Sequence, residues 1–518
     1  MKYYFLTLCL FLTLTIAAQV PEDALRTSWF APSGTARQQA IGGAMGSLGG
    51  EISATYVNPA GLGFYRTGEI VLSPGYRFQK DNSIYRGTSS SGSTVGNFNL
   101  GTSGVVFAIP SQNPEGSGAI SITVNRTANF GGNTYYKGQN DYSSFSEQYV
   151  EEFAKSGLSI DQALGNSGLS YGTRMALYTY LIDTATIGGT LQVIGQPQKI
   201  LDAHGLLLQE NNIRTKGGIT EIALGLGGSG RGKWYYGGSI GVPILDYTRN
   251  QTFTESDLTG NTNNDFNYST YTETYTSKGV GVNFKLGVIF KPDNAWRVGL
   301  AIHSPSFYAL TDNISAAMTT NTDKYAAPSS ISSAELDSQT GSVGSVKYDL
   351  QSAWKVLLSG SYIFGGGPEN TKGQKGFITG DVEWVVNRDS KFSSPQDNNG
   401  NPLYDNGYFD AVNNAIKSYY RNNFNVRLGG ELKFDLLAAR LGFAYSTSPY
   451  KQSGLQANRL TIAGGVGYRN KGVFVDLTYV QNITNDVNFP YRLADKENTY
   501  ATVKQFAGTV LLTVGFKF

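Results

Sequence analysis

Residues 501–518, ATVKQFAGTVLLTVGFKF, decide the fold class of this 518-residue chain. Read at a period of two, one face of this stretch carries Phe506, Val510, Leu512, Val514, Phe516 and Phe518, and the other carries Thr509, Leu511, Thr513, Gly515 and Lys517. One apolar face and one face of mostly small or polar residues indicate a strand of a β-barrel that lies in lipid. Such a strand must pair on both sides, because an open edge in hydrocarbon leaves backbone groups without hydrogen bonds. The alternative is an edge strand of a soluble β protein.

The amino end has the organisation of a secretory signal peptide, predicted over residues 1–18. Lys2 supplies a positive charge, residues 3–16 are apolar, and a small-residue cleavage site follows, which we expect to be cut after Ala18. Cys9, the single cysteine of the sequence, lies within this segment. The mature chain therefore has no thiol, which excludes disulfides, cysteine-ligated metals and a cysteine nucleophile.

The composition of the rest of the chain also fits a barrel. No stretch after the signal peptide approaches the roughly 18–20 apolar residues that a transmembrane helix needs. Aromatic residues make up 13% of the chain, charged residues 15%, and glycine occupies 64 positions. This is typical of a barrel with alternating strands and aromatic girdles. A formal net charge of +2 provides no basic stripe, so we expect no nucleic-acid partner.

From Thr67 onward, alternation and turn residues predict about fourteen strands, an even number as in single-chain bacterial barrels. Their ranges are 67–80, 98–109, 117–130, 211–228, 233–252, 269–291, 295–313, 344–364, 376–388, 418–434, 437–450, 459–469, 472–484 and 501–518. Connections after even-numbered strands are short, whereas the long ones, such as 131–210 and 389–417, all follow odd-numbered strands. A soluble sandwich has no reason to sort its loops in this way. We therefore predict an all-β protein, a transmembrane antiparallel barrel over residues 67–518 with long extracellular loops.

Residues 19–66 do not read as barrel wall, because they are rich in glycine and alanine and show little alternation. Side chains this small bury too little apolar surface to form a core of their own. We expect this segment, named here the plug (or hatch), to lie inside the barrel. A flexible periplasmic arm is the alternative interpretation.

Three sequence features resemble the FadL/TodX family of outer-membrane transporters for hydrophobic compounds. They are the run Asn58, Pro59, Ala60, Gly61 and Leu62 ahead of the first strand, the stretch 296–305 (WRVGLAIHSP), and the paired stretches 427–430 (RLGG) and 440–445 (RLGFAY). The resemblance implies that the Asn58–Leu62 run forms the hatch turn, which shifts to let a ligand leave sideways into the bilayer. The aromatic end of the last strand also resembles the insertion signal of outer-membrane barrels, carried here by Phe516 and Phe518.

The family resemblance further implies a location and partners. It places the protein in the outer membrane of a Gram-negative cell, in contact with outer-membrane lipid, after insertion by the barrel-assembly machinery. The implied function is passive uptake of hydrophobic small molecules, such as long-chain fatty acids or aromatic hydrocarbons, by a monomer. Two alternatives stay open: a non-enzymatic, secretion-associated barrel resembling PorV, and a haem receptor barrel.

Charged residues in the predicted strands are expected to face the lumen, because a charge facing hydrocarbon costs about 2–4 kcal/mol at the bilayer midplane. They are Lys285, His303, Asp381, Glu383, Arg427, Glu431, Arg440 and Asp476. One interpretation is that they pair with one another and anchor the plug by hydrogen bonds. The other is that an arginine or lysine meets the carboxylate of an amphiphilic ligand.

The longest predicted loop, 131–210, contains apolar stretches. Residues 146–154 have helical periodicity, and 175–182 are densely apolar and aromatic. Apolar side chains on an extracellular loop suit the capture of a hydrophobic ligand. The candidate capture residues are Tyr149, Phe153, Met175, Leu177 and Tyr178. The alternative is that these segments pack on each other and only cap the barrel.

No pattern in the chain supports an enzyme, a metal or a cofactor. Residues 227–233 (GGSGRGK) have P-loop spacing, but Trp234 occupies the position of the magnesium-binding hydroxyl and a strand follows instead of a helix. A calcium loop starting at Asp397 would need an acidic residue where Tyr408 stands. The sequence has two histidines, too few for a multi-histidine metal site, and no G-x-S-x-G nucleophile elbow accompanies them.

Overall fold

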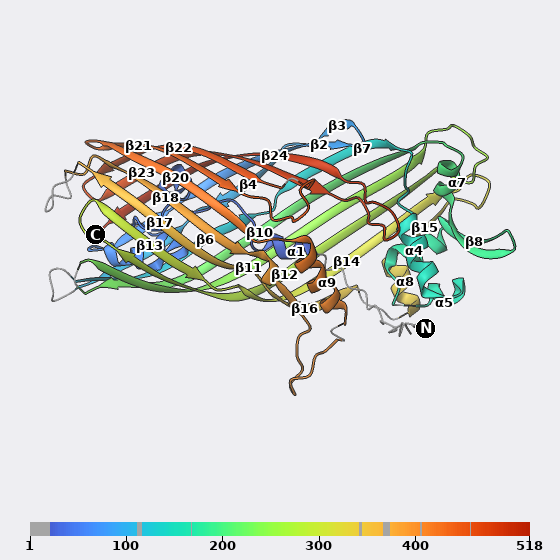
Figure 1. Cartoon of the computed structure of the whole chain (residues 1–518), viewed down its shortest axis with the longest axis horizontal. Helices are drawn as coiled ribbons and strands as arrows, with labels where there is room; N and C mark the ends of the chain where they lie inside the picture. The colour runs from blue at the N-terminus through green and yellow to red at the C-terminus, as the bar shows by residue number, and fades with distance from the viewer. Residues whose placement is uncertain are drawn as a thin grey trace, which may run out of the picture.

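The computed structural model of the protein describes residues 21–110, 116–166, 168–230, 232–340, 344–365, 373–404, 407–455 and 457–518. The predicted signal peptide lies outside these residues. Figure 1 shows one long barrel of oblique strands, with the C-terminus at one end and several helices gathered at the other. This separation of ends fits the predicted division into short turns on one side and long loops on the other.

A closed ring of fourteen antiparallel barrel strands forms the wall, which confirms the predicted fold class. Some barrel strands consist of two segments. In chain order they are β1 (Glu69–Leu72) with β2 (Pro74–Tyr85), β4 (Val95–Leu100) with β5 (Ser103–Ile109), β6 (Ser117–Asn129) with β7 (Gly132–Asn140), β10 (Leu207–Ser229), β11 (Trp234–Asp257), β12 (Tyr268–Phe290), β13 (Trp296–His303) with β14 (Phe307–Asn321), β16 (Ser345–Gln351) with β17 (Trp354–Phe364), β18 (Gly376–Val386) with β19 (Lys391–Ser393), β20 (Asn423–Phe434), β21 (Leu437–Ser446), β22 (Arg459–Asn470), β23 (Val473–Asn488) and β24 (Ala501–Lys517). The ring closes where β24 pairs with β1 and β2, for example at Leu72 and Val514.

The terminal strand β24 has the two faces that its sequence predicts. Its apolar residues Val510, Leu512, Val514 and Phe516 are exposed on the outside of the barrel. The residues between them point inward and are buried. Outward apolar side chains on neighbouring strands continue this surface, so the barrel presents an apolar band to its surroundings, as a barrel in lipid must.

Several predicted strand boundaries differ from the structure, as at β14, which runs to Asn321 instead of 313. Two of the differences change how a loop is built. The predicted strand 418–434 starts only at Asn423, because α9 (Gly407–Tyr419) occupies its first residues and buries Phe409, Val412 and Ile416 against the barrel interior. The predicted loop 131–210 is shorter, because β7 continues the third barrel strand to Asn140 beside β10. Alternation is weak at both places, so sequence periodicity could not set these boundaries.

The plug fills the lumen with short elements: α1 (Pro21–Arg26), α2 (Ala36–Ala40), α3 (Ala54–Val57) and the 3₁₀ helix η1 (Pro59–Phe64). Small residues let its backbone touch the wall directly. A Cβ on Gly42, which has a φ of +67°, would lie 2.6 Å from the carbonyl oxygen of Phe443 on β21. Ile41, Ala44 and Ile52 are completely buried, although the plug has no core of its own. The surrounding barrel therefore supplies the packing that the plug sequence lacks.

The extracellular loops carry the remaining elements. They are β3 (Thr88–Ser91), α4 (Glu147–Ser156), α5 (Ile160–Leu164), α6 (Tyr171–Tyr178), the hairpin β8 (Ile182–Ile187) and β9 (Thr190–Gly195), α7 (Gln196–Asp202), β15 (Ser329–Ser332), α8 (Ser333–Thr340) and the 3₁₀ helix η3 (Asn387–Asp389). Helices α4, α5 and α6 pack together and share a core with the ends of β11 and β14 (Figure 1). In the described part of the chain, no helix is both long enough and apolar enough to span a membrane.

Candidate functional site

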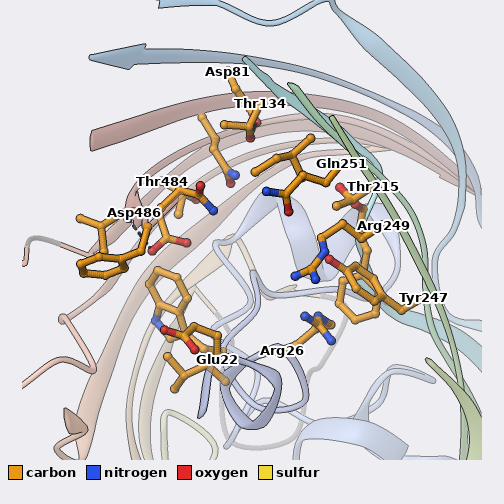
Figure 2. Close-up of a pocket in the computed structure, with 18 of the residues that line it drawn as sticks. Glu22, Arg26, Asp81, Thr134, Thr215, Tyr247, Arg249, Gln251, Thr484 and Asp486 are labelled. Atoms are coloured by element: carbon orange, nitrogen blue, oxygen red, sulfur yellow. Dashed lines mark hydrogen bonds between the residues drawn. The ribbon is translucent and has the colours of Figure 1, made fainter. Parts of the chain in front are cut away.

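The main cavity lies inside the barrel and has a volume of about 860 Å³. Toward the plug it is lined by Trp29 and Phe30, which follow α1, and toward the extracellular end by Phe145 and Tyr149 of the α4 region. Inward side chains of the barrel wall surround it, and Figure 2 shows residues from several strands converging on a common space. A cavity of this size can hold a small amphiphilic or aromatic molecule.

Charged groups line this cavity together with the aromatic ones. Arg249 Nη2 lies 2.6 Å from Glu273 Oε1, and the Arg26 guanidinium lies 3.7 Å from the centre of the Tyr247 ring (Figure 2). Burial, together with the charge of Glu273, raises the pKa of Tyr149 well above its ordinary range, so this phenol stays neutral. The cavity is therefore mixed in character rather than purely apolar.

The barrel wall is interrupted beside the cavity. Among the described residues, β4 pairs with β2 but has no partner strand on its other side, where β6 and β7 pass. Side chains bridge the interruption instead: Arg77 Nη1 donates to the Asn129 carbonyl oxygen at 3.1 Å, and the hydroxyl of Thr134 donates to Asp81 Oδ2 at 2.7 Å. We call this interruption the side break.

A second, smaller cavity of about 140 Å³ lies behind the plug segment 30–33, which also lines the main cavity. Its walls carry several charged side chains, including Lys355, whose ammonium lies 4.6 Å from the centre of the Phe30 ring. His303 also lines it, and His303 Nε2 lies 2.8 Å from the carbonyl oxygen of Val57. The plug segment 30–33 thus separates two spaces inside the barrel.

Three of the predicted lumen charges contact the plug directly: His303, whose contact with Val57 is given above, Asp381 and Glu431. The Asp381 carboxylate accepts hydrogen bonds from the backbone N–H groups of Met45 at 3.0 Å and Gly46 at 3.2 Å. Glu431 accepts from Arg37 of α2, with Nε at 3.0 Å and Nη2 at 3.3 Å. These contacts join the plug to β13, β18 and β20.

The other predicted lumen charges form pairs along the inner wall. Arg440 bridges Glu431 and Asp476, with N···O distances of 2.6 Å on both sides. Arg427 Nη2 lies 2.8 Å from Glu383 Oε1. Lys285 pairs with Glu221, a residue that the sequence interpretation did not include. All eight predicted residues face inward or are buried, as their position in the alternation implies.

The predicted hatch turn is buried deep in the lumen. Asn58 caps η1 by accepting a hydrogen bond from Ala60 N at 3.2 Å, and its amide donates to the Gly46 carbonyl oxygen at 2.6 Å. Pro59, Ala60, Gly61 and Leu62 follow within η1 and are buried. The same side chain therefore holds two parts of the plug together.

A carboxyl inside the plug is also buried. Glu51 Oε1 accepts a hydrogen bond from the Thr35 hydroxyl at 2.6 Å, and Oε2 accepts from Ser53 N at 2.9 Å. Burial raises the pKa of Glu51, and these hydrogen bonds only partly oppose the shift.

The five candidate capture residues occupy two different environments. Phe153, Met175 and Leu177 are buried in the shared core of the loop helices. Tyr149 is also buried but lines the main cavity, and Tyr178 is exposed. The apolar run in the loop sequence thus serves mainly to pack the helices on one another. A role of Tyr149 and Tyr178 in ligand capture stays a prediction.

The two C-terminal aromatic residues lie on the outer surface. Phe516 and Phe518 are both exposed, and the backbone of Phe518 exchanges hydrogen bonds with Gly68, the residue before β1. The ring of Phe518 covers Gly68, where a Cβ would lie 2.4 Å from it. Their role in membrane insertion stays a prediction.

Sequence reasoning missed the side break and the residues around it. Arg77, Gln79 and Asp81 alternate on the inward face of β2, and this polar run was the available signal. Its significance depends on the missing partner of β4, which strand periodicity does not reveal. Across the described ranges, no group of three or more His, Cys, Asp or Glu side chains is arranged to hold a metal ion.

The fold and its filled lumen define a class: a closed barrel with an internal plug and an enclosed cavity. No family model and no curated protein match the sequence. Among solved structures, it is similar to the crystal structure of a Pseudomonas aeruginosa FadL homologue, with a TM-score of 0.54, 13% identity, and coverage of 94% of this chain and 99% of the other. It is also similar to the P. putida toluene transporter TodX, with a TM-score of 0.50, 11% identity, and coverage of 95% and 99%. The chain therefore has the FadL-type fold.

Proposed function

We propose that this protein is an outer-membrane channel for the passive uptake of hydrophobic small molecules. The observation that carries the proposal is the cavity of about 860 Å³ inside the barrel, lined by residues of the plug and of the loop helices. An apolar outer band, a fold like those of the FadL homologue and the toluene transporter TodX, and loop helices over the cavity all support it. The solved structures that share this fold are those of a FadL homologue and of a transporter, and we therefore propose no chemical reaction for this protein.

The route that we propose runs from the extracellular loops into the main cavity and then sideways into the bilayer. Arg77, Asp81 and Asn129 line both the cavity and the side break, so a ligand in the cavity already lies beside the interruption in the wall. Outward residues at this level are aromatic, because Tyr76 and Phe98 are exposed there. A ligand that leaves here enters hydrocarbon rather than water.

Movement of the plug is the second element of the proposal. Asn58 links η1 to Gly46, and Gly46 is held by Asp381 on the wall. A shift of this unit would change the space between the two cavities. The hydrogen bonds of Asn58 are each worth about 0.5–1.5 kcal/mol, so Asn58→Ala weakens the closed arrangement without removing it.

A disulfide across the side break tests the route. A Cβ on Gly131 would lie 2.6 Å from Asn97 Cγ, so the two Cβ atoms would be at most about 4.1 Å apart, below the upper limit of the roughly 3.5–4.5 Å that a disulfide spans. The mature chain has no other cysteine if cleavage follows Ala18. The Asn97→Cys/Gly131→Cys variant should form this bond on oxidation.

Uptake is measured in Gram-negative cells that lack their own fatty-acid channel, with a radiolabelled long-chain fatty acid and a labelled aromatic hydrocarbon. We expect uptake to fall when the double variant is oxidised and to recover with reductant, while each single-cysteine variant is unaffected. Equal uptake with the cross-link fully formed would reject the sideways route. Absence of any uptake by the unmodified protein, with secretion of other proteins reduced on its deletion, would favour the secretion-associated alternative.

A further inference from the structure

One wall of the main cavity is polar over four adjacent barrel strands. Arg459 on β22 is opposite Thr484 on β23, Thr484 is opposite Gln505 on β24, and Gln505 is opposite Asp81 on β2. All four side chains line the cavity, and so does Asp486, the next inward residue on β23. A molecule composed only of hydrocarbon would remove water from this wall without replacing its hydrogen bonds, which is unfavourable.

Arg459 offers a positive charge that the described residues do not neutralise. Its Nε donates to the Thr484 hydroxyl at 3.1 Å, and its guanidinium lies 4.4 Å from the centre of the Trp29 ring. No carboxylate of the described chain lies within ion-pair distance of it, and its Nη1 has no hydrogen-bond partner there. The indole Nε1 of Trp29 also lacks a partner among these residues. Both atoms are buried, so a ligand reaches them only with a small shift of the two side chains, and the group that would satisfy them is anionic or strongly accepting.

Asp486 offers a negative charge on the same wall. Its Oδ1 accepts a hydrogen bond from Val487 N at 2.8 Å, and no cation in the described ranges lies within ion-pair distance of its carboxylate. Asp486 lies two residues after Thr484, which is the register partner of Arg459. Two residues span about 6.6–6.8 Å along a strand. The two opposite charges attract each other across the wall, but they are too far apart to form a direct ion pair.

The other side of the cavity carries aromatic side chains beside the Arg249–Glu273 ion pair. Phe30, Tyr247, Tyr149 and Tyr271 line it from the plug, β11, α4 and β12. Figure 2 shows Asp486 and Thr484 on one side of the space and Tyr247 on the opposite side. The cavity is therefore amphipathic, with unpaired charges facing an aromatic surface.

We propose that the main cavity binds a zwitterionic amphiphile, with its anionic group at Arg459 and Trp29 Nε1, its cationic group at Asp486, and its apolar chain along the aromatic walls. This inference deepens the proposed function, on which it rests, by naming the substrate class. This cavity therefore differs from a binding site for pure hydrocarbons, because both charges of the ligand's head group are needed to form contacts with the polar wall.

Four probes with the same octyl chain test the inference: octylphosphocholine, octanoate, octyltrimethylammonium and octanol. Trp29 reports binding by fluorescence once the other four tryptophans, all exposed on the outer surface, are replaced by phenylalanine; they are Trp234, Trp296, Trp354 and Trp384. The protein is held in nanodiscs of phosphatidylglycerol, so that no zwitterionic lipid competes. We expect octylphosphocholine to bind about tenfold or more tightly than octanol, because its head makes charge-assisted hydrogen bonds.

Single substitutions test the contacts of the cationic and the anionic group of the ligand separately. Asp486→Asn should lower the affinity for octylphosphocholine and octyltrimethylammonium about tenfold, because their quaternary ammonium loses its Coulomb partner, and should not weaken the binding of octanoate. Arg459→Gln should lower the affinity for octylphosphocholine and octanoate, measured by calorimetry because this side chain contacts the reporter ring. Lys504→Gln, on the outward face of β24, is the matched control and should change none of them. Heat-dependent mobility in gels shows that each variant is a folded barrel.

Two further measurements separate the parts of the inference. Glycerophosphocholine, which has the head but no chain, should bind more weakly than octylphosphocholine if the ligand is an amphiphile and not a free zwitterion. Equal affinities for all four octyl probes, or variants that leave their ranking unchanged, would overturn the inference even if uptake is observed. The predicted ranking without any uptake would support this site while rejecting the transport function.

Discussion

Asp381 is the residue whose substitution tests most directly how the plug is held. Its carboxylate accepts two backbone hydrogen bonds from the plug, from Met45 N and Gly46 N, and a third from Ser359 Oγ at 2.6 Å. In Asp381→Asn the side chain keeps its shape, but it loses its charge and one of its two accepting oxygens. Both plug N–H groups donate to the same oxygen, Oδ2, so the amide oxygen of Asn can take that place while its NH2 group faces the Ser359 hydroxyl, which can accept. The two plug contacts then have a neutral acceptor in place of a charged one.

The size of the effect follows from these contacts. A hydrogen bond to a charged group contributes about 1.5–3 kcal/mol and one to a neutral group about 0.5–1.5 kcal/mol, so neutralising the acceptor of two plug contacts costs about 2–3 kcal/mol. Because each 1.4 kcal/mol is a factor of ten, the fraction of undocked plug should rise by roughly 10- to 100-fold. The wall is less affected, since β18 keeps its complete backbone pairing with β17 and β20.

Single-channel recording in planar bilayers measures the undocked fraction as open events. We expect frequent openings for Asp381→Asn and rare ones for the unmodified protein. Asp435→Asn, in the exposed turn between β20 and β21, makes the same chemical change away from the plug and should behave as the unmodified protein does. If Asp381→Asn forms a heat-modifiable barrel with the same opening frequency, the reasoning that these two contacts dock the plug is wrong.

Three further outcomes are expected. Phe153→Ala removes a side chain from the core of the loop helices, so those helices should lose about 3–5 kcal/mol of stability and be cleaved faster by protease while the barrel remains intact. The pKa of Glu51 is raised in the docked plug, so the docked plug binds more protons than the undocked one. Docking should therefore strengthen as pH falls toward the ordinary glutamate pKa. Glu51→Gln should remove this part of the pH dependence of channel opening. Phe518→Ala should lower the amount of protein inserted into the outer membrane, whereas barrels that do form should resist heat as before; normal insertion would show that the terminal ring is not a signal.

The wall was predictable because a strand in lipid is determined locally. Each residue of β24 faces either hydrocarbon or the lumen, so Leu512 and Thr513 report their environments by their polarity alone. Where the surroundings are not lipid, this rule fails. Residues 418–422 resemble their strand neighbours in composition, yet α9 ends among them because its apolar residues pack against the plug helix α1.

The cavity and its contacts depend on positions far apart in the chain. Arg459 and Trp29 are 430 residues apart in the chain, yet Arg459 Nη2 lies 3.5 Å from the Trp29 carbonyl oxygen. Nothing in the local sequence of either residue specifies this contact. The loop residue Phe153 shows the converse: its apolar neighbours suggested a surface for capture, but the helices bury it.

The sequence by itself determined that the chain forms a closed barrel of alternating strands with a small-residue segment inside, because lipid on one side and a lumen on the other impose a period of two on every strand. Only the tertiary structure decided which inward charges meet the plug, where β4 loses its partner strand, and which charges in the cavity stay unpaired. Those features depend on the register between distant strands and on the path of the plug through the lumen. Neither leaves a periodic trace in the sequence, because each is set by contacts between segments and not within them.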